Sequence, residues 1–186
     1  MTVRGNPEQI SLGPGYLHTS PLGAVEPVDL VTAWNVVDPN WIGLGYTGNG
    51  SEFNYQLQTG EVHVAEELDP ITNTPTGRTS SVTFDLAQLT ATNLQIAHNG
   101  GTITQGQDVV IFEPPDLGEE VRAMLGWESE DHTERWIWRQ ALMNGALKIT
   151  RTKGSSNATI ACTFTLEKPA TGAKLYKAIL AAPLRA

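Results

Sequence analysis

Gly43, Gly45 and Gly48 have the spacing of a dinucleotide-binding turn. Such a turn joins a strand to a helix, so that the amides at the helix start face a pyrophosphate. In this chain a strand pattern, and not a helix, begins at Phe53 shortly after the glycines. The motif therefore predicts a turn into a hairpin and no cofactor-binding residue.

No two of the four histidines lie within four residues of each other, so the HExxH pattern of zinc enzymes is missing. His132 lies in an acidic run, residues 128–134, whose carboxylates could hold a cation. A solvated acidic turn between two strands explains the same run, and we favour that interpretation. We predict no metal site.

The chain also lacks the Gly-x-Ser-x-Gly elbow that exposes a catalytic serine. Its one cysteine, Cys162, alternates with Ile160 and Phe164, which predicts a small hydrophobic residue in a core. Paired carboxylates occur, but an acidic protein has such pairs by composition alone. We predict no catalytic residue and no enzymatic activity.

Trp136 and Trp138, flanked by Arg135 and Arg139, resemble a platform on which nucleobases stack. Residues two apart in a strand point to the same face, so both tryptophans would lie side by side. We favour a packed core or a subunit contact over nucleic-acid binding for this pair.

The length of 186 residues and mass of 20.1 kDa fit a single domain over residues 1–186. No run of 18 apolar residues is present, so we expect no membrane-spanning helix. The first residues lack the apolar stretch of a secretory signal, so we expect a soluble protein made in the cytoplasm of the producing cell. A single cysteine excludes an internal disulfide.

The net charge of −8 is unevenly distributed. Residues 1–120 contain two basic and fifteen acidic residues, whereas residues 121–186 contain ten basic and five acidic residues. Nucleic-acid binders need clustered Lys and Arg, so the acidic part argues against general DNA binding. Opposite charges in the two parts favour attraction between copies, unless the parts interleave in space and the asymmetry averages out.

Strict alternation of apolar and polar residues predicts several short strands, for example over residues 53–57, 82–86 and 160–166. Residues 85–99 predict one helix, with Asp85 or Thr90 as the N-cap. Many strands and one helix indicate a mainly β fold, a β-sandwich or barrel-like domain.

Two segments lack a core pattern. Residues 1–40 carry five prolines and no sustained period, which predicts an extended N-terminal arm. Residues 66–80 contain Pro70, Pro75 and Gly77 and few apolar residues, which predicts a long loop between strands.

The order of these features resembles a known family, the major tail (tail tube) proteins of long-tailed bacteriophages of the siphophage type, and particularly those of actinobacterial hosts. The resemblance spans nearly the whole chain. It rests on the order and spacing of residues 15–23 (GYLHTSPLG), 41–47 (WIGLGYT), 81–86 (SVTFDL) and 94–100 (LQIAHNG).

The resemblance implies a structural virion protein whose copies join into rings, typically of six, with inner sheets merged into one barrel. The rings would stack into a tube through which the genome is ejected, with DNA as passing cargo. Expected partners are other copies of the chain, the tape measure protein, the tail terminator and the distal tail or baseplate proteins. No cofactor is expected.

Two groups of residues are expected to serve assembly. Residues 1–30 and 66–80 would make ring-to-ring contacts because they are long and lack a core pattern. The interface candidates are Tyr16, Leu17, Leu22, Leu68, Asp69, Pro70, Ile71, Pro75 and Arg78. Acidic residues on outward strand positions would line the inner wall and repel DNA phosphates. The lumen candidates are Glu52, Glu61, Asp108, Glu119, Glu120, Glu128 and Glu130.

Two alternatives remain at this point. A tail terminator, a baseplate hub, or a tailocin or secretion-system tube would share the same fold logic, and stacked rings would distinguish a tube from a single ring. A monomeric β-sandwich that binds a small ligand is the alternative from another class.

Overall fold

The computed structural model describes residues 13, 15–63, 65, 69–151, 158–170 and 172–182. Within these residues the chain is mainly β, as predicted, with eleven strands and two short helices. None of the helices in these ranges is long and apolar enough to cross a membrane. The elements are β1 (Tyr16–Pro21), α1 (Trp34–Val37), β2 (Ile42–Gly43), β3 (Thr47–Val62), β4 (Thr72–Leu86), α2 (Ala91–Ala97), β5 (Thr102–Gln105), β6 (Val110–Glu113), β7 (Ala123–Glu128), β8 (Glu134–Met143), β9 (Lys148–Thr150), β10 (Thr159–Leu166) and β11 (Tyr176–Leu180).

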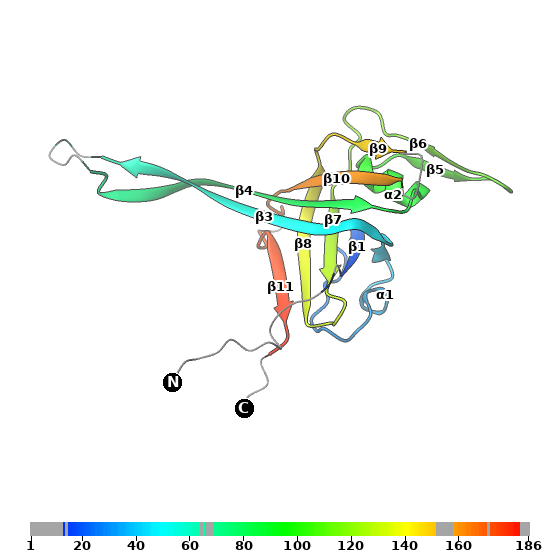
Figure 1. The fold of residues 1–186 in the computed structure, drawn as a ribbon, viewed down its shortest axis with the longest axis horizontal. Helices are drawn as coiled ribbons and strands as arrows, with labels where there is room; N and C mark the ends of the chain where they lie inside the picture. Colours follow the sequence, from blue (N-terminus) through cyan, green and yellow to red (C-terminus); the bar gives the residue numbers. More distant parts are fainter. Residues whose placement is uncertain are drawn as a thin grey trace.

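Nine strands form one antiparallel sheet in the order β2-β1-β7-β8-β10-β4-β3, with β11 paired to β8 and β9 paired to β10. The long strand β8 joins two parts of this sheet, because its first half pairs with β11 and its second half with β10. Figure 1 shows β3, β4 and β10 running crosswise over β7 and β8. The two parts thus form the layers of a sandwich-like body.

The main core lies between these layers. In β10 every second residue is buried, from Ile160 to Leu166, which confirms the predicted alternation. Phe84 of β4 stacks on Phe164 of β10 with ring centroids 5.5 Å apart. β1 and β7 contribute Leu17 and Leu125 from the opposite layer.

A second, smaller cluster covers the other face of β7 and β8. It consists of Trp34, Trp41, Met124 and Ile137, all less than 5% exposed. Residues 22–33, which we call the strap, cross this face between β1 and α1. Both faces of the β7–β8 pair are therefore covered.

Helix α2 is shorter than the predicted helix over residues 85–99. Thr90 is its N-cap and accepts a hydrogen bond from the Asn93 amide at 3.1 Å, whereas Asp85 belongs to β4. Asn99 has a φ of 57° and ends the helix, as expected for an Asn-Gly-Gly stop. Helix α1 is one turn long and was not predicted.

The predicted loop over residues 66–80 is wrong from residue 72 onward, since β4 begins at Thr72. Its first half pairs only with β3, and a register shift between Gln58 and Thr59 places Pro75 at a bulge. A bulge on a two-stranded ribbon tolerates proline because no second neighbour needs its amide.

The predicted arm over residues 1–40 also differs from the structure. Residues 16–21 form β1, which pairs with β7 along its whole length. The strap and α1 occupy most of the rest. Residues 1–12 and 14 of the predicted arm lie outside the described residues.

Candidate assembly surfaces

The longest exposed feature is the β3–β4 hairpin. It runs for sixteen residues in β3 and fifteen in β4, and Figure 1 shows its far half extending away from the body. In this half Tyr55, Leu57 and Ile71 are 46–55% exposed. Isolated two-stranded ribbons are marginally stable in water, so a surface that covers this half would stabilise it.

The near half of the same hairpin has two different faces. Phe53, Val82 and Phe84 point into the core. The opposite face carries small polar residues, arranged in cross-strand rows by the register, such as Glu52 beside Thr83 and Thr83 beside Thr163. The residues of this polar face are Glu52, Asn54, Thr79, Ser81, Thr83, Asp85, Thr159, Ala161, Thr163 and Thr165.

The polar face contains the carboxylates of Glu52 and Asp85, and its one basic residue is Lys148 of β9, which pairs with Ala161 at the margin of the face. Strand β3 also ends the sheet, because it pairs with β4 on one edge and with none of the described strands on the other. An unpaired strand of this length is a template for pairing with another chain.

Most of the predicted interface residues within the described part are exposed. Leu17 is an exception, because it is 1% exposed and belongs to the core, so its assignment to an interface was wrong. Leu68 lies outside the described residues. The exposed candidates are Tyr16, Leu22, Asp69, Pro70, Ile71, Pro75 and Arg78.

The predicted lumen residues are scattered over several elements, and only Glu52 lies on the polar face. Glu128 is 4% exposed, so the prediction that it lines a lumen was wrong. Glu120 is half-buried. The exposed members are Glu52, Glu61, Asp108, Glu119 and Glu130.

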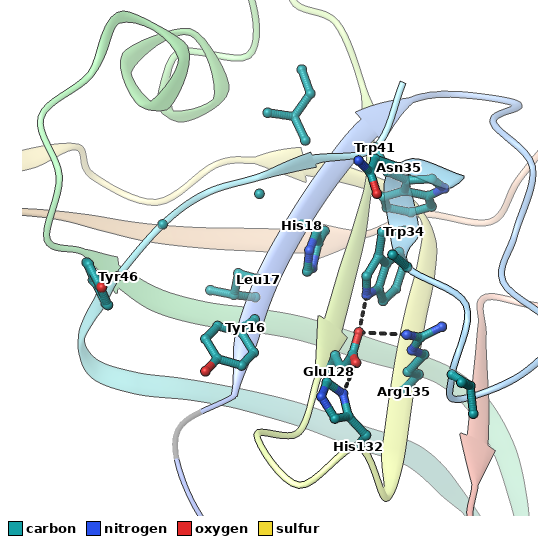
Figure 2. A pocket seen from close by; sticks show the side chains of 15 residues that line it. Tyr16, Leu17, His18, Trp34, Asn35, Trp41, Tyr46, Glu128, His132 and Arg135 are labelled. Atoms are coloured by element: carbon teal, nitrogen blue, oxygen red, sulfur yellow. Dashed lines mark hydrogen bonds and ion pairs between the residues drawn. The ribbon is translucent and has the colours of Figure 1, made fainter. Parts of the chain in front are cut away.

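Glu128 lies at the base of an open hollow of about 820 Å³ beneath α1, shown in Figure 2. Its carboxylate accepts hydrogen bonds from the Trp34 indole and from His132, and forms an ion pair with Arg135 at 3.0 Å. Burial alone would raise the pKa of Glu128, but the hydrogen bonds from Arg135, His132 and Trp34 outweigh it and lower the pKa.

Arg135 connects this cluster to the strap. Its guanidinium, 1% exposed, donates hydrogen bonds to the carbonyl oxygens of Asp29 and Thr32 at 3.0 and 2.8 Å. Farther along the strap, Arg139 binds the Glu26 carboxylate and Lys177 donates to the Pro27 carbonyl. The basic residues of β8 and β11 therefore hold the strap on the sheet.

His18 stacks on Trp34 with ring centroids 4.7 Å apart. Burial lowers the pKa of His18 to about 4, so its imidazole is neutral at pH 7. Among the residues that the structure describes, no three His, Cys, Asp or Glu side chains are placed to hold a metal ion. The hollow thus holds one satisfied carboxylate and a neutral imidazole, an arrangement that fastens α1 and the strap.

The glycine motif, the cysteine and the tryptophan pair, which the sequence offered as candidates for chemistry, all lie in environments that favour a structural role. Strand β3, and not a helix, follows Gly43–Gly45. Burial raises the pKa of Cys162 to about 12, which keeps it a thiol. Trp136 and Trp138 contact Phe53 at 5.6 and 5.7 Å between ring centroids, which confirms the packed-core interpretation.

Sequence reasoning missed the buried polar cluster. Arg135 occupies the same face of β8 as the buried Ile137, and an arginine in an apolar alternation was the available signal. Glu128, the ion-pair partner of Arg135, accepts a hydrogen bond from Trp34, which lies 94 residues away in the chain. Sequence spacing alone could therefore not reveal this contact.

A comparison with protein families gives the identity of this architecture. A family model described as phage tail tube protein matches residues 4–176, which includes every strand from β1 to β10. No curated protein matches the chain. The chain therefore belongs to the phage tail tube protein family and is a structural component of the tail tube.

Proposed function

We propose that copies of this chain close into rings, typically of six, and that the rings stack into the tube through which phage DNA is ejected. The observation that carries the proposal is the far half of the β3–β4 hairpin, whose two faces are both exposed. A ribbon of this kind gains stability when another copy covers it, and we assign that role to a copy in the neighbouring ring.

Side-by-side closure would use the open edge of β3. A strand edge that pairs with a different edge of the next copy is a heterologous contact, and such contacts give rings when the rotation closes. Backbone hydrogen bonds across this edge would extend the β10–β4–β3 layer from copy to copy.

The polar face of this layer would then line the bore. It has small hydroxyl and amide side chains, the carboxylates of Glu52 and Asp85, and a single basic residue at its margin, Lys148. Phosphates bind to clustered Lys and Arg, so this face would let DNA pass without holding it. On this arrangement the remaining acidic candidates would lie outside the bore; they are Glu61, Asp108, Glu119, Glu120 and Glu130.

The wider setting follows from the same resemblance. We place the chain in a siphophage-type tail with an actinobacterial host, made in the host cytoplasm and built into the virion. Its further partners would be the tape measure protein inside the tube, a terminator at one end, and distal tail or baseplate proteins at the other.

The test is to shorten the hairpin. A variant in which a short Asn-Gly turn replaces residues 59–76 joins the paired Gln58 and Gly77, removes the far end and keeps the near half that builds the core. We expect a folded protein with an unchanged melting temperature and no tubes by negative-stain electron microscopy. A Leu117→Ser variant, altered at an exposed apolar residue elsewhere, is the control and should form tubes. Normal tubes from the shortened chain would contradict the proposal.

A further inference from the structure

The β5–β6 hairpin presents a second exposed apolar surface. On one side Val110 and Phe112 face α2 and line a space with Leu94. On the other side Val109 and Ile111 are 60% and 51% exposed. Figure 1 shows this hairpin projecting at the end of the molecule opposite the tip of β3–β4.

The surroundings of this surface are uniformly acidic. Residues 101–121 contain five acidic residues and no Lys, Arg or His. Asp108 lies in the turn beside Val109, and Glu113 follows on the same side of β6 as Ile111. Val109 and Ile111 therefore form an apolar ridge with carboxylates at both ends.

A hollow of complementary character lies where the strap begins. It has a volume of about 190 Å³ and is bounded by Leu22 and Ala24 of the strap, by the buried Met124, and by Ala173. The loop that bounds it carries Lys168 and Lys174. No residue of β5 or β6 lines this hollow.

The uncompensated charge beside this hollow is basic, and it comes from two lysines that are chain neighbours of the lining residues Pro169 and Ala173. Lys168 and Lys174 are exposed and make no ion pair with any residue in the described part of the chain. Glu26, the one carboxylate at the hollow, is bound by Arg139 and Lys177, so its charge is already compensated. An acidic, apolar ridge is complementary to such a hollow in charge, and both surfaces are apolar.

We propose that the β5–β6 hairpin of one copy inserts Val109 and Ile111 into this hollow of a second copy, with Asp108 and Glu113 facing Lys174 and Lys168. The proposal rests on the proposed function, since it needs copies that assemble. The two surfaces differ and lie apart on one chain, so each copy has one ridge and one hollow. The contact is therefore heterologous and repeats from copy to copy.

Paired cysteines test the contact directly. Tubes are assembled from an equal mixture of Ile111→Cys and Ala173→Cys chains and then oxidised. We expect disulfide-linked dimers of the two variants on a non-reducing gel, and none from either variant alone. Wild-type chains report the background from Cys162, whose buried thiol should not react. Leu117→Cys, 98% exposed and outside the ridge, is the matched control and should give no dimer with Ala173→Cys.

Charge exchange gives an independent measurement. Asp108→Lys and Lys174→Asp should each raise the protein concentration needed for assembly by about tenfold, and the double variant should recover to within about threefold of wild type. Lys148→Asp, at an exposed lysine of β9, should leave this concentration unchanged.

The two proposals fail in different ways. Wild-type protein that forms no tubes would overturn the proposed function and this contact with it. Normal tubes without mixed-variant dimers, or a double variant no better than the single ones, would overturn the contact alone.

Discussion

The two halves of the β3–β4 hairpin share a ladder but have opposite environments. In the near half, Val82, Phe84 and Leu86 are at most 2% exposed. In the far half, residues 72–79 of β4 have no buried member. Strands β3 and β4 therefore remain paired from the core of the body out into solvent. The near half obtains its stability from the body, whereas the far half has apolar residues available for a partner.

The largest effect should come from breaking the near half. Phe84→Ala removes a ring that stacks on Phe164 and leaves a cavity, which costs about 3–5 kcal/mol of the free energy of unfolding. Leu57→Ala in the far half should change this free energy by less than about 0.5 kcal/mol. Urea unfolding of the free chain measures both. Equal losses would mean that the far half already has a core of its own.

A smaller loss should follow from Glu128→Gln, which tests how the strap and α1 are held on the body. The change leaves the buried Arg135 with only the Asp29 carboxylate, 3.9 Å away, as a counter-charge, which costs about 3 kcal/mol. Because the folded pKa of Glu128 is lowered, its contribution is present above the unfolded pKa and is lost as pH falls through the folded value. The exposed Glu130→Gln is the control, and a similar loss there would contradict this account.

The smallest effect at neutral pH should come from His18→Phe. The folded pKa of His18 is about 4 and the unfolded value is 6.5, so the unfolded chain binds the proton first as pH falls. Wild type should lose about 3 kcal/mol between pH 7 and pH 4 through this residue. The phenylalanine variant should lose that much less over the same range, as measured by urea unfolding at each pH. An unchanged pH slope would show that His18 is not buried in its neutral form.

The sequence predicted the near half well. Alternation in β10 and at residues 82–86 reflects burial of one strand face, and Thr90 has the hydroxyl that a helix start requires. Period and capping are local properties, so a single chain displays them.

The far half could not be predicted from the same rules. Its residues from 72 to 79 include Pro75 and Gly77, which usually mark loops, and their strand form depends on pairing with β3. The predictions for Leu17 and Glu128 were wrong for a related reason, since the burial of both residues depends on residues distant in sequence. Tertiary contacts determine the burial and conformation of these residues, and local sequence patterns do not encode such contacts.

Hydrogen exchange along β3 and β4, measured in the free chain and in assembled tubes, tests the central claim most directly. We expect amides of the near half, such as those of Val82 and Phe84, to be protected in both states. Amides of the far half, such as those of Leu57 and Arg78, should exchange rapidly in the free chain and become protected in the tube. Far-half amides that exchange equally fast in both states would contradict the claim that another copy covers this ribbon.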